Sequence, residues 1–529
     1  MIRFALIFLF FFNRTLVAQT RIELLNANKL EYDKNRIDAK RLIGNVSFQH
    51  EQAVMYCDSA YLFANNQVDA FANIKILQGD TLQMYGNFLH YDGNTKIAEL
   101  TKDVRLIDKE MSLTSAFLRY DLNSGLASYN GNGKIINKEN TLTSSNGYYY
   151  SKSKDFYFKK NVVLVNPQYI VKCDTLKYNT LSEIAYFLSP TKIISKENSI
   201  YCENGWYDTK LDIAQFNKHA SLKNPKQELT GDSLYYNRNL GYGKAIGSIE
   251  MNDSTENITI KGDFGEYFEN DDNTIVTGHA LLIQKFDIDT LFLHADILRL
   301  TNDSALSKSL ESKLKKVVKA GKSVTNNKKE KKIVKAREMN RSDSKRVLMA
   351  YNKVKFYKND LQGKCDSLVF TYRDSTKRLF TAPIICSDIN QLTADSINIH
   401  TYQGIIKSMD LKKNSFIASK EDSIGYNQIC GKNMKGHFTQ NKLSKMDVFG
   451  NGQTIYYAQD KDGIIGVNKT VCSNMVIKIK DNKVISILFV NKPDANIYPM
   501  NELSPKDLLL PNFGWYVELR PKSKADLFK

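Results

Sequence analysis

The sequence predicts an all-β fold built as a solenoid-like stack of 29-residue units, and two regularities carry this prediction. The first is a tyrosine that returns every 29 residues. It occupies Tyr91, Tyr120, Tyr149, Tyr178, Tyr207 and Tyr236, and then Tyr267 after a shift of two. The second is a small residue five positions before each tyrosine, in order Gly86, Ser115, Ser144, Cys173, Cys202, Gly231 and Gly262. A fixed period of this length is typical of stacked repeat units rather than of a single globular core.

Within each unit, apolar and small residues alternate with the period of two that marks a β-strand. Val171 and Cys173 share one parity, whereas Leu176 and Tyr178 share the other. The strand must therefore change face between its two halves, and we expect a β-bulge or corner at the intervening acidic residue, Asp174. One long bent strand would then bury apolar groups on both arms, which predicts a two-walled stack.

A second strand completes each unit, and a short turn motif precedes its apolar run. Gly44-Asn45 before Val46 and Lys102-Asp103 before Val104 are examples. Asn, Asp and Gly favour tight turns because they adopt backbone conformations that other residues avoid. Each repeat is therefore predicted to supply two strands.

The chain begins with the features of a secretory signal peptide, predicted over residues 1–19. Arg3 gives a positive head, residues 4–12 form an apolar run, and Ala18 offers a small-residue cleavage site. The apolar run is too short to span a bilayer as a helix. We expect an exported protein, and a retained N-terminal anchor is the alternative.

A basic segment, residues 303–346, interrupts the repeat domain predicted over residues 20–302. It contains 15 Lys or Arg and 5 Asp or Glu, so it carries +10 of the chain's net charge of +17. Because the charge is concentrated there, the repeats themselves do not predict a nucleic-acid partner. We expect a flexible, partly helical insertion, either a solvated loop or a patch that meets anionic head groups or phosphates.

The repeat resumes after this insertion. Cys365-Asp366 and Ala394-Asp395 stand 29 residues apart, so residues 347–440 are predicted to continue the stack. From residue 441 onward short strands without the period lead to Trp515. Because the open end of a stack exposes unpaired backbone, we predict that residues 441–529 form a β cap module.

No pattern in the sequence indicates catalysis, a metal or a cofactor. The seven histidines lack metal-ligand spacing, and no phosphate loop or nucleophile motif occurs. The acidic residues beside the small position, such as Asp174, recur in step with the repeat, which suits turn chemistry better than the acid cluster of a polysaccharide-cleaving enzyme. We therefore expect a protein that is not an enzyme and needs no cofactor.

The cysteines fit the repeat rather than a disulfide framework. The chain has seven, and Cys57, Cys173, Cys202 and Cys365 occupy the small position of the unit. Equivalent positions lie two strands apart, about 9.6 Å, which a disulfide cannot bridge. We expect compact, buried free thiols.

Two motifs recur along the repeats, as in Gly44-Asn45-Val46, Gly231-Asp232-Ser233-Leu234 and Ala295-Asp296-Ile297-Leu298. In these motifs the chain resembles the OstA-like family, the periplasmic lipopolysaccharide-transport proteins. The resemblance covers roughly residues 20–300 and 347–440. It implies a V-shaped β-jellyroll that shields lipid acyl chains inside and pairs with neighbouring proteins through an open edge.

The resemblance also implies a function and a location. We expect binding of lipopolysaccharide, through its lipid A part, and transport toward the outer membrane from the periplasm, with outer-membrane association as a further expectation. Expected partners are other lipopolysaccharide-transport proteins, joined by edge-strand pairing, and further copies of the chain by self-association. With this repeat, 529 residues leave no room for the membrane barrel of the large family member, so we expect a soluble one.

The groove that would hold acyl chains is predicted from the inward apolar positions of both arms. Burial of a methylene group is worth about 0.8 kcal/mol, so an apolar groove of similar sites could hold a chain and let it slide. The predicted lining residues are Met84, Leu89, Leu113, Leu118, Leu142, Val171, Leu176, Ile200, Leu229 and Leu234. The same residues would fill a dry core equally well, so a structural or adhesin-like β-repeat protein is the alternative.

Overall fold

The computed structural model describes residues 20–109, 111–286, 289–302, 346–421, 425–459, 463–480 and 483–529. The predicted signal peptide and all of the predicted basic insertion except Arg346 lie outside these residues. Within them the chain forms 36 strands and four short 3-10 helices, so the all-β prediction is confirmed. None of the described helices is long and apolar enough to cross a membrane. The chain divides into two compact units, residues 1–212 and 213–529.

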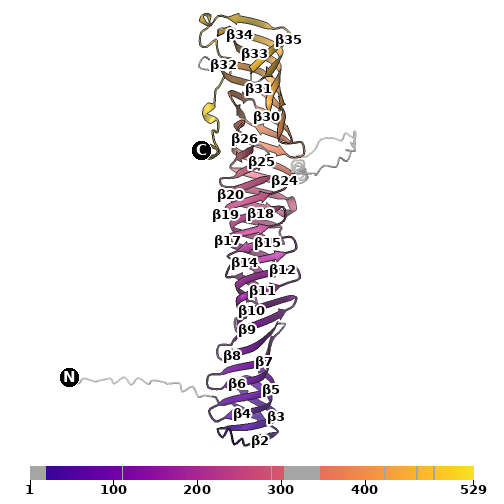
Figure 1. Ribbon diagram of the computed structural model, residues 1–529, viewed down its shortest axis with the longest axis vertical. Coiled ribbons are helices and arrows are strands. Elements are labelled where there is room, and N and C mark those ends of the chain that lie inside the picture. The colour runs from indigo at the N-terminus through magenta and orange to yellow at the C-terminus, as the bar shows by residue number, and fades with distance from the viewer. Residues whose placement is uncertain are drawn as a thin grey trace, which may run out of the picture. The chain divides into compact units, whose positions relative to one another are not determined.

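The first unit is an antiparallel meander in which each long strand pairs with the next one along the chain (Figure 1). Its strands are β1 (Glu23–Asn26), β2 (Lys29–Glu31), β3 (Ala39–His50), β4 (Ala53–Phe63), β5 (Gln67–Gln78), β6 (Leu82–Asp92), β7 (Ile97–Asp108), β8 (Met111–Asp121), β9 (Leu126–Asn137), β10 (Asn140–Tyr150), β11 (Asp155–Val165), β12 (Tyr169–Asn179), β13 (Ile184–Phe187), β14 (Thr191–Ser195), β15 (Ser199–Cys202) and β16 (Asn204–Asp208).

Each long strand of this unit has two arms with opposite inward faces. On β6 the buried residues are Leu82 and Met84 on the first arm, then Leu89 and Tyr91 on the second. The buried parity therefore changes from even to odd in the middle of the strand. This change confirms the two-walled stack, because both arms point apolar groups into the same interior.

The arms meet at a line of β-bulges, which we call the crease. Ile43 pairs with Ser59 and Val46 pairs with Cys57, so two residues of β3 lie opposite the single residue Asp58 of β4. Both extra residues have a left-handed backbone, with φ of 78° at Gly44 and 47° at Asn45. The expected bulge exists, but its extra residues belong to the strand paired with the acidic residue and not to the strand that carries it.

The aspartate at the crease accepts a hydrogen bond from the bulge of the neighbouring strand. Asn73, a left-handed residue in the bulge of β5, donates a hydrogen bond to the Asp58 carboxylate at 2.7 Å. In the same way, Asn414 donates to Asp395 at 3.0 Å in the second unit. The aspartate accepts a hydrogen bond from a bulge residue of the adjacent strand, so it stabilises the left-handed backbone of that bulge.

The second unit repeats this plan with more interruptions. Its strands are β17 (Ile213–Lys223), β18 (Gln227–Asn237), β19 (Tyr242–Asp253), β20 (Ile258–Phe268), β21 (Asn273–Thr277), β22 (Leu281–Lys285), β23 (Thr290–His294), β24 (Ile297–Asn302), β25 (Arg346–Lys358), β26 (Leu361–Thr371), β27 (Thr376–Phe380), β28 (Ile384–Ser387), β29 (Asn390–Thr393), β30 (Ser396–Tyr402), β31 (Ile405–Glu421), β32 (Gly425–Thr439), β33 (Lys442–Gln459), β34 (Ile464–Lys480), β35 (Lys483–Val490) and β36 (Asp494–Tyr498). Its 3-10 helices are η1 (Glu269–Asp271), η2 (Met500–Glu502), η3 (Val517–Leu519) and η4 (Lys524–Phe528).

The last residues, 499–529, form a segment without strands that runs back along the second unit (Figure 1). Three buried glutamines hold its backbone or side chains. Gln428 exchanges two hydrogen bonds with the backbone of Leu508 and Leu510, both at 2.8 Å. Gln391 does the same with Gly514 and Tyr516 at 2.7 Å, and Gln362 accepts a bond from Arg520 at 2.8 Å. We call residues 499–529 the C-terminal tail.

Candidate functional site

The candidate site is the interior between the two arms of the first unit. One side of this interior is the crease, and the other is the mouth, where both arms end in hairpin turns. On the first arm Met84, Leu113, Leu142 and Val171 are buried, and on the second arm Leu89, Leu118 and Leu176 are buried. Ile200 is half-buried at the end of this unit. Of the predicted groove residues in the second unit, Leu229 is half-buried and Leu234 is buried.

Register joins the first-arm residues into one apolar row. Met84 pairs with Leu106, which pairs with Leu113, and Leu142 pairs with Leu164, which pairs with Val171. Paired residues of an antiparallel ladder point to the same face of the sheet. The row is therefore continuous across the inward face of the first arm.

The mouth is closed at its N-terminal end by a contact between the two arms. The His50 ring nitrogen Nδ1 lies 2.5 Å from the Tyr91 hydroxyl, and both side chains are buried. His50 is the last residue of β3 and lies in the wall that contains Met84, whereas Tyr91 stands near the end of β6 in the opposite wall. Beside it, Lys96 and Glu51 form an ion pair at 2.6 Å. Tyr91, one of the tyrosines that return every 29 residues, thus joins the two walls through a hydrogen bond with His50.

A second closure, which we call the Asp108 clasp, consists of Asp108, Tyr149 and Lys154. The Tyr149 hydroxyl donates a hydrogen bond to the Asp108 carboxylate, and Lys154 Nζ donates to the same oxygen at 2.7 Å. Thr81 donates to the other oxygen at 2.8 Å. Asp108 is the last residue of β7 and lies in the wall that contains Met84, and Tyr149 of β10 lies in the opposite wall, so this group also joins the two walls.

The electrostatics of the clasp favour an ionised carboxylate. Burial by itself raises the pKa of Asp108, but the hydrogen bonds from Lys154, Tyr149 and Thr81 outweigh burial, and the pKa lies below its ordinary value. Burial, followed by the bond to Asp108, raises the pKa of Tyr149. The tyrosine therefore stays protonated at neutral pH and keeps its proton for the bond.

Between the arms, next to the clasp, lies an apolar cavity of about 70 Å³. Its first-arm lining includes Leu142 and Val171, and its second-arm lining includes Phe158, Leu176 and Phe187. Three of the ten predicted groove residues therefore surround one enclosed space, and both walls contribute to it. The full lining is Met111, Ile135, Asn137, Asn140, Leu142, Phe156, Phe158, Leu164, Tyr169, Val171, Leu176, Tyr178, Thr180, Ala185, Phe187, Tyr207 and Thr209.

The cavity occurs where the series of closures stops. Asn137 and Tyr178 stand one period after Asp108 and Tyr149, and both side chains line the cavity. Within the residues that the structure describes, no hydrogen bond joins Asn137 to Tyr178. Tyr91 and Tyr149 are buried, whereas Tyr178 and Tyr207 are only partly buried. Hydrogen bonds between the walls thus join His50 to Tyr91 and Asp108 to Tyr149, and the described residues show none between Asn137 and Tyr178.

A larger recess, of about 870 Å³, lies along the crease of the same unit. Its lining includes Lys102, Asp103, Asn132, Lys134 and Ser145. Charged and amide side chains do not shield an acyl chain from water, so this recess does not match the predicted apolar groove.

The sequence-based predictions missed the closing residues His50, Asp108 and Lys154. One signal was present: Asp108 and Asp253 lie five periods apart in a row that otherwise holds Asn, Ser, Gly or His. In the second unit Asp253 forms an ion pair with Arg346 at 2.6 Å. The row that contains Asp108 and Asp253 therefore lies at the mouth, and each aspartate in it takes part in a contact that closes the mouth.

The described residues contain no group of three or more His, Cys, Asp or Glu that could hold a metal ion. The seven cysteines are free, and Cys57, Cys202, Cys365, Cys386 and Cys472 are buried. Burial, with a smaller contribution from Asp58, raises the pKa of the Cys57 thiol to about 12, so it carries almost no thiolate at neutral pH.

Comparison with known proteins finds a family match over the N-terminal part of the chain. Residues 19–174 and 170–232 match the family model described as OstA-like protein. The comparison with curated proteins finds no match. The matched residues cover both walls, the crease, the two closures and the cavity of the first unit. The family is a transport family and not an enzyme family. Over these residues the chain is similar to the OstA-like family, whose members are generally periplasmic and have a function of the lipopolysaccharide-transport type.

Proposed function

We propose that this protein binds the lipid A part of lipopolysaccharide in the periplasm and passes it toward the outer membrane, with the acyl chains held between the two arms of the first unit. The observation that supports this most is the apolar cavity lined by Leu142, Val171 and Leu176. It lies in the region matched by the family model, and both walls line it.

The energetics favour an acyl chain as the ligand. Each methylene group removed from water is worth about 0.8 kcal/mol, so one chain of roughly a dozen carbons gains on the order of 10 kcal/mol before costs. Successive repeats present nearly the same inward residues, for example Leu113 and Leu142. Neighbouring sites of similar affinity allow a chain to move along the interior when the drive comes from a partner.

The size of the cavity sets a condition on this function. A volume of about 70 Å³ is well below the roughly 300–1,000 Å³ of pockets that enclose drug-sized ligands. An acyl chain therefore enters only if the arms separate at the mouth. Separation of the walls at Asn137 and Tyr178 breaks no hydrogen bond between these two described side chains, whereas separation at Tyr149 breaks the Asp108 clasp.

A photocrosslinking amino acid at Leu176 tests the proposal. The matched control is Lys177, the next residue of β12, which points to the outer face of the same wall because side chains alternate along a strand. In cells that make lipopolysaccharide, we expect a lipid A adduct at position 176 and none at position 177. A second probe at Leu142 covers the opposite wall.

The filled-core alternative gives the opposite result. Met84 and Leu118 are fully buried, as in a dry β stack. A structural or adhesin-like protein would give no adduct at Leu142, Val171 or Leu176, and native mass spectrometry would find the purified protein free of lipid. That pair of results would refute the carrier function.

We further propose that the N-terminal edge of the stack pairs with other lipopolysaccharide-transport proteins or with a second copy. The edge strands β1 and β2 expose Leu24, Leu25 and Leu30, and Leu30 is 62% exposed. Unpaired edge strands with apolar side chains readily accept another strand. Leu30→Lys should abolish this association in copurification while Tm stays unchanged, and unchanged association would exclude this edge.

A further inference from the structure

The outer face of the wall that contains Met84 carries two neighbouring rows of side chains in the first unit. Side chains alternate along a strand, so Gln83 and Tyr85, on either side of the buried Met84, point outward. Paired residues of an antiparallel ladder share a face, so register extends both rows across the strands. What we call the basic row runs from Lys75 through Tyr85 to Lys192, and what we call the apolar row runs from Leu77 through Gln83 to Ile194.

The basic row contains five Lys or Arg and no acidic residue. Lys172 pairs directly with Lys192, although like charges opposite each other in a ladder are destabilising. Within the residues that the structure describes, no carboxylate forms an ion pair with Lys134, Lys172 or Lys192. The row therefore presents positive charge that the protein does not neutralise. Its charged members are Lys75, Arg105, Lys134, Lys172 and Lys192.

The recess of about 870 Å³ along the crease borders the basic row. Its lining contains three basic residues, Lys102, Arg105 and Lys134, and one acidic residue, Asp103. The Asp103 carboxylate already accepts a hydrogen bond from Asn87 at 2.8 Å. The recess is therefore positively charged, and the hydroxyl groups of its serine and threonine residues add hydrogen-bonding groups.

A missing side chain accounts for the opening of the crease at this recess. Ala116 stands where Asp58 and Asn87, in the two preceding repeats, bond the bulge of the adjacent strand. A methyl group makes no such bond, and the ladder between β8 and β9 is interrupted from Ser115 to Arg119. The outer face is thus hollowed beside the basic row.

The apolar row lies next to these charges and is uncovered within the described part of the chain. Ile136 is 43% exposed, Val165 44% and Ile170 37%. Exposed aliphatic side chains that adjoin a charged strip are typical of a protein-interaction surface. A partner for this face therefore needs both apolar and acidic side chains.

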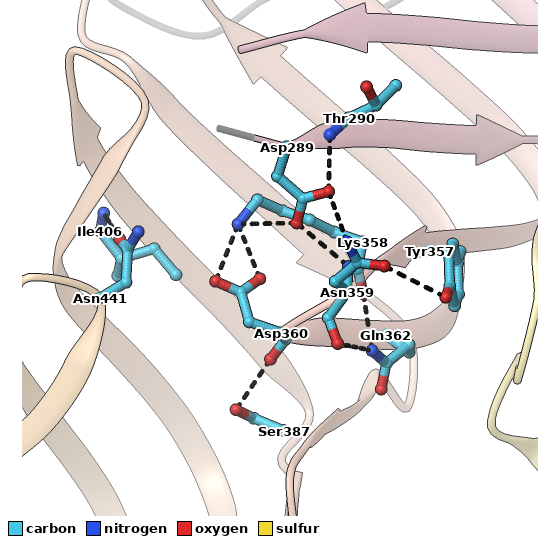
Figure 2. Close-up of polar contacts among 10 residues, drawn as sticks. All are labelled: Asp289, Thr290, Tyr357, Lys358, Asn359, Asp360, Gln362, Ser387, Ile406 and Asn441. Atoms are coloured by element: carbon cyan, nitrogen blue, oxygen red, sulfur yellow. Dashed lines mark hydrogen bonds and ion pairs between the residues drawn. The ribbon is translucent and has the colours of Figure 1, made fainter. Parts of the chain in front are cut away.

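The second unit shows what covers the equivalent face. Gln362 stands at the position of the repeat that Gln83 has in the first unit. Its side-chain amide donates to the main-chain oxygens of Lys358 at 2.6 Å and Asn359 at 2.8 Å (Figure 2), and its side-chain oxygen accepts the bond from Arg520. The C-terminal tail therefore lies on the outer face of this wall, held by polar side chains of the row.

The lysines of the equivalent basic row in the second unit have partners. Lys261 forms an ion pair with Glu250 at 2.8 Å, and the two residues stand opposite each other in that row. Lys355 stands opposite another lysine, as Lys172 does, and its Nζ donates to the main-chain oxygen of Lys529 in the tail. A peptide segment thus supplies an oxygen to a lysine pair of this kind.

Charge decides which occupant suits the face of the first unit. The basic segment, residues 303–346, carries +10, and the tail of a second copy would bring five Lys or Arg against four Asp or Glu. Neither complements the basic row, whereas an acidic segment of another protein does.

The tail also indicates how long such a segment is. It advances about six residues for each two strands, from Gly514 at Gln391 to Arg520 at Gln362. Six strand steps separate Arg105 from Lys192. At about 4.8 Å a step this is about 29 Å, which a segment of about 18 residues crosses.

We propose that the recess, the basic row and the apolar row form a docking surface for an acidic, partly apolar segment of another protein. Its carboxylates bind Arg105, Lys134 and Lys172, and its apolar side chains pack on Ile136 and Ile170. The surface lies on the outside of the wall, so it does not depend on any ligand between the walls.

The test measures binding of a synthetic acidic peptide of about 18 residues to the full chain by isothermal titration calorimetry. In this peptide Asp and Glu alternate with Leu, Ser and Gly, and in the control peptide Asn and Gln replace Asp and Glu. The variants are Lys134→Glu, Lys172→Glu and Ile170→Ser. The control variant is Lys159→Glu, at an exposed residue of β11 on the outer face of the opposite wall.

Lys134→Glu and Lys172→Glu should each weaken binding of the acidic peptide roughly tenfold, because an attraction is replaced by a repulsion. Ile170→Ser should weaken it by a smaller factor, and Lys159→Glu should leave it unchanged. The control peptide should bind more weakly and should not distinguish Lys172→Glu from the native chain. The Tm of Lys172→Glu should not fall, because a glutamate opposite Lys192 replaces two like charges by opposite ones.

The proposal is overturned if the native chain does not bind the acidic peptide, or if both charge-reversed variants bind it as tightly as the native chain. Vesicles of phosphatidylglycerol and phosphatidylcholine test a membrane instead. If they bind in a manner that depends on Lys172 and the peptide does not bind, the face is a membrane-binding surface and the proposal fails. It also fails if Ile170→Ser abolishes only self-association. Photocrosslinks at Leu176 should be the same in Lys172→Glu and the native chain, which separates this result from the fate of the lipid A groove.

Discussion

At the scale of single residues, the mouth of the first unit depends on a small number of side chains whose charge states matter. The Asp108 carboxylate side chain is 4% exposed and receives bonds from Tyr149, Lys154 and Thr81. An ion pair at the surface is worth little, but a buried carboxylate with three donors is stabilised by several charged hydrogen bonds. The clasp therefore holds the two walls together at this repeat.

The first prediction concerns the pH dependence of the Asp108 clasp. Because the folded-state pKa of Asp108 is lower than its ordinary value of 3.8, its contribution is fully present above that value and is lost as the pH falls through the folded pKa. Asp108→Asn should lower the stability by about 1.5–3 kcal/mol at pH 7. The Tm difference from the native chain should shrink below about pH 4. Thermal melts from pH 7 to pH 3 measure it.

The control for this experiment is Asp366→Asn, at an exposed position of β26. It should change Tm little at any pH, since the side chain is solvated. A Tm difference for Asp108→Asn that stays constant from pH 7 to pH 3 would contradict the prediction, because it would mean that the loss does not come from the ionised carboxylate.

The partners of these closing residues could not be predicted from the sequence, whereas the rows of apolar residues could. Met84 and Leu113 repeat with the period, and the alternation of polar and apolar residues determines which face they occupy. The partners His50 and Tyr91 stand 41 residues apart, which is no multiple of 29. Their contact depends on how the two arms face each other, and that arrangement is not encoded in any local pattern.

At the scale of elements, the strands follow the predicted parity, but the crease follows a rule that the pattern did not contain. The extra residues are Gly44-Asn45 in one 29-residue repeat and Lys102-Asp103 in another, and all four have a left-handed φ. The sequence marked these residues as a turn, and the structure makes them a bulge inside a continuous strand. Both features need the same backbone conformation, so composition alone does not separate them.

The second prediction concerns the glycines that make room for Tyr129 between β9 and β10. A Cβ at Gly147 would lie 2.2 Å from Tyr129 Cε1, and one at Gly133 would lie 2.3 Å from Cε2. The ring is fixed from both sides, and its hydroxyl bonds Ser144 at 2.6 Å. Gly147→Ala should therefore destabilise the first unit by about 1–3 kcal/mol through overpacking.

Gly243→Ala is the matched control, because Gly243 is also buried in a strand and its nearest contact to an added Cβ is at an ordinary 3.6 Å. Chemical denaturation of both variants, with hydrogen exchange to locate the effect, measures the difference. Equal stability of the two variants would mean that the Tyr129 ring moves aside, and the close-packing explanation would fail.

At the scale of the whole chain, the sequence predicted repeats on both sides of the basic segment, and the division into a signal peptide, repeats, insertion and cap stays a prediction. The backbone path of the C-terminal tail was not predicted. Gln362 and Gln391 stand one period apart, but glutamine in a strand gives no indication of a partner more than 120 residues later. Contacts of such long range come from the folded surface and not from local pattern.

The third prediction concerns how this tail stabilises the second unit. Gln391 is 2% exposed and bonds both the Gly514 carbonyl and the Tyr516 amide, each at 2.7 Å. Gln391→Leu keeps the size of the side chain but leaves two backbone groups unpaired, at a cost of about 1–3 kcal/mol for each that stays buried. We expect a lower Tm and faster hydrogen exchange in residues 499–529. The control is Gln453→Leu, at a half-buried residue of β33. It should leave both the Tm and the hydrogen exchange of residues 499–529 unchanged.

The location of the exchange distinguishes two ways in which the tail could act. Phe513 and Trp515 pack against Tyr426, with ring centres 5.0 Å apart, so the tail also covers apolar surface of the wall. If the tail is a separate layer, exchange in Gln391→Leu should rise in the tail and in the strands under it, β29 and β31, and exchange in the first unit should stay at its native rate. An equal rise throughout both units would mean that the effect is not confined to the tail and the strands under it, and the separate-layer explanation would fail.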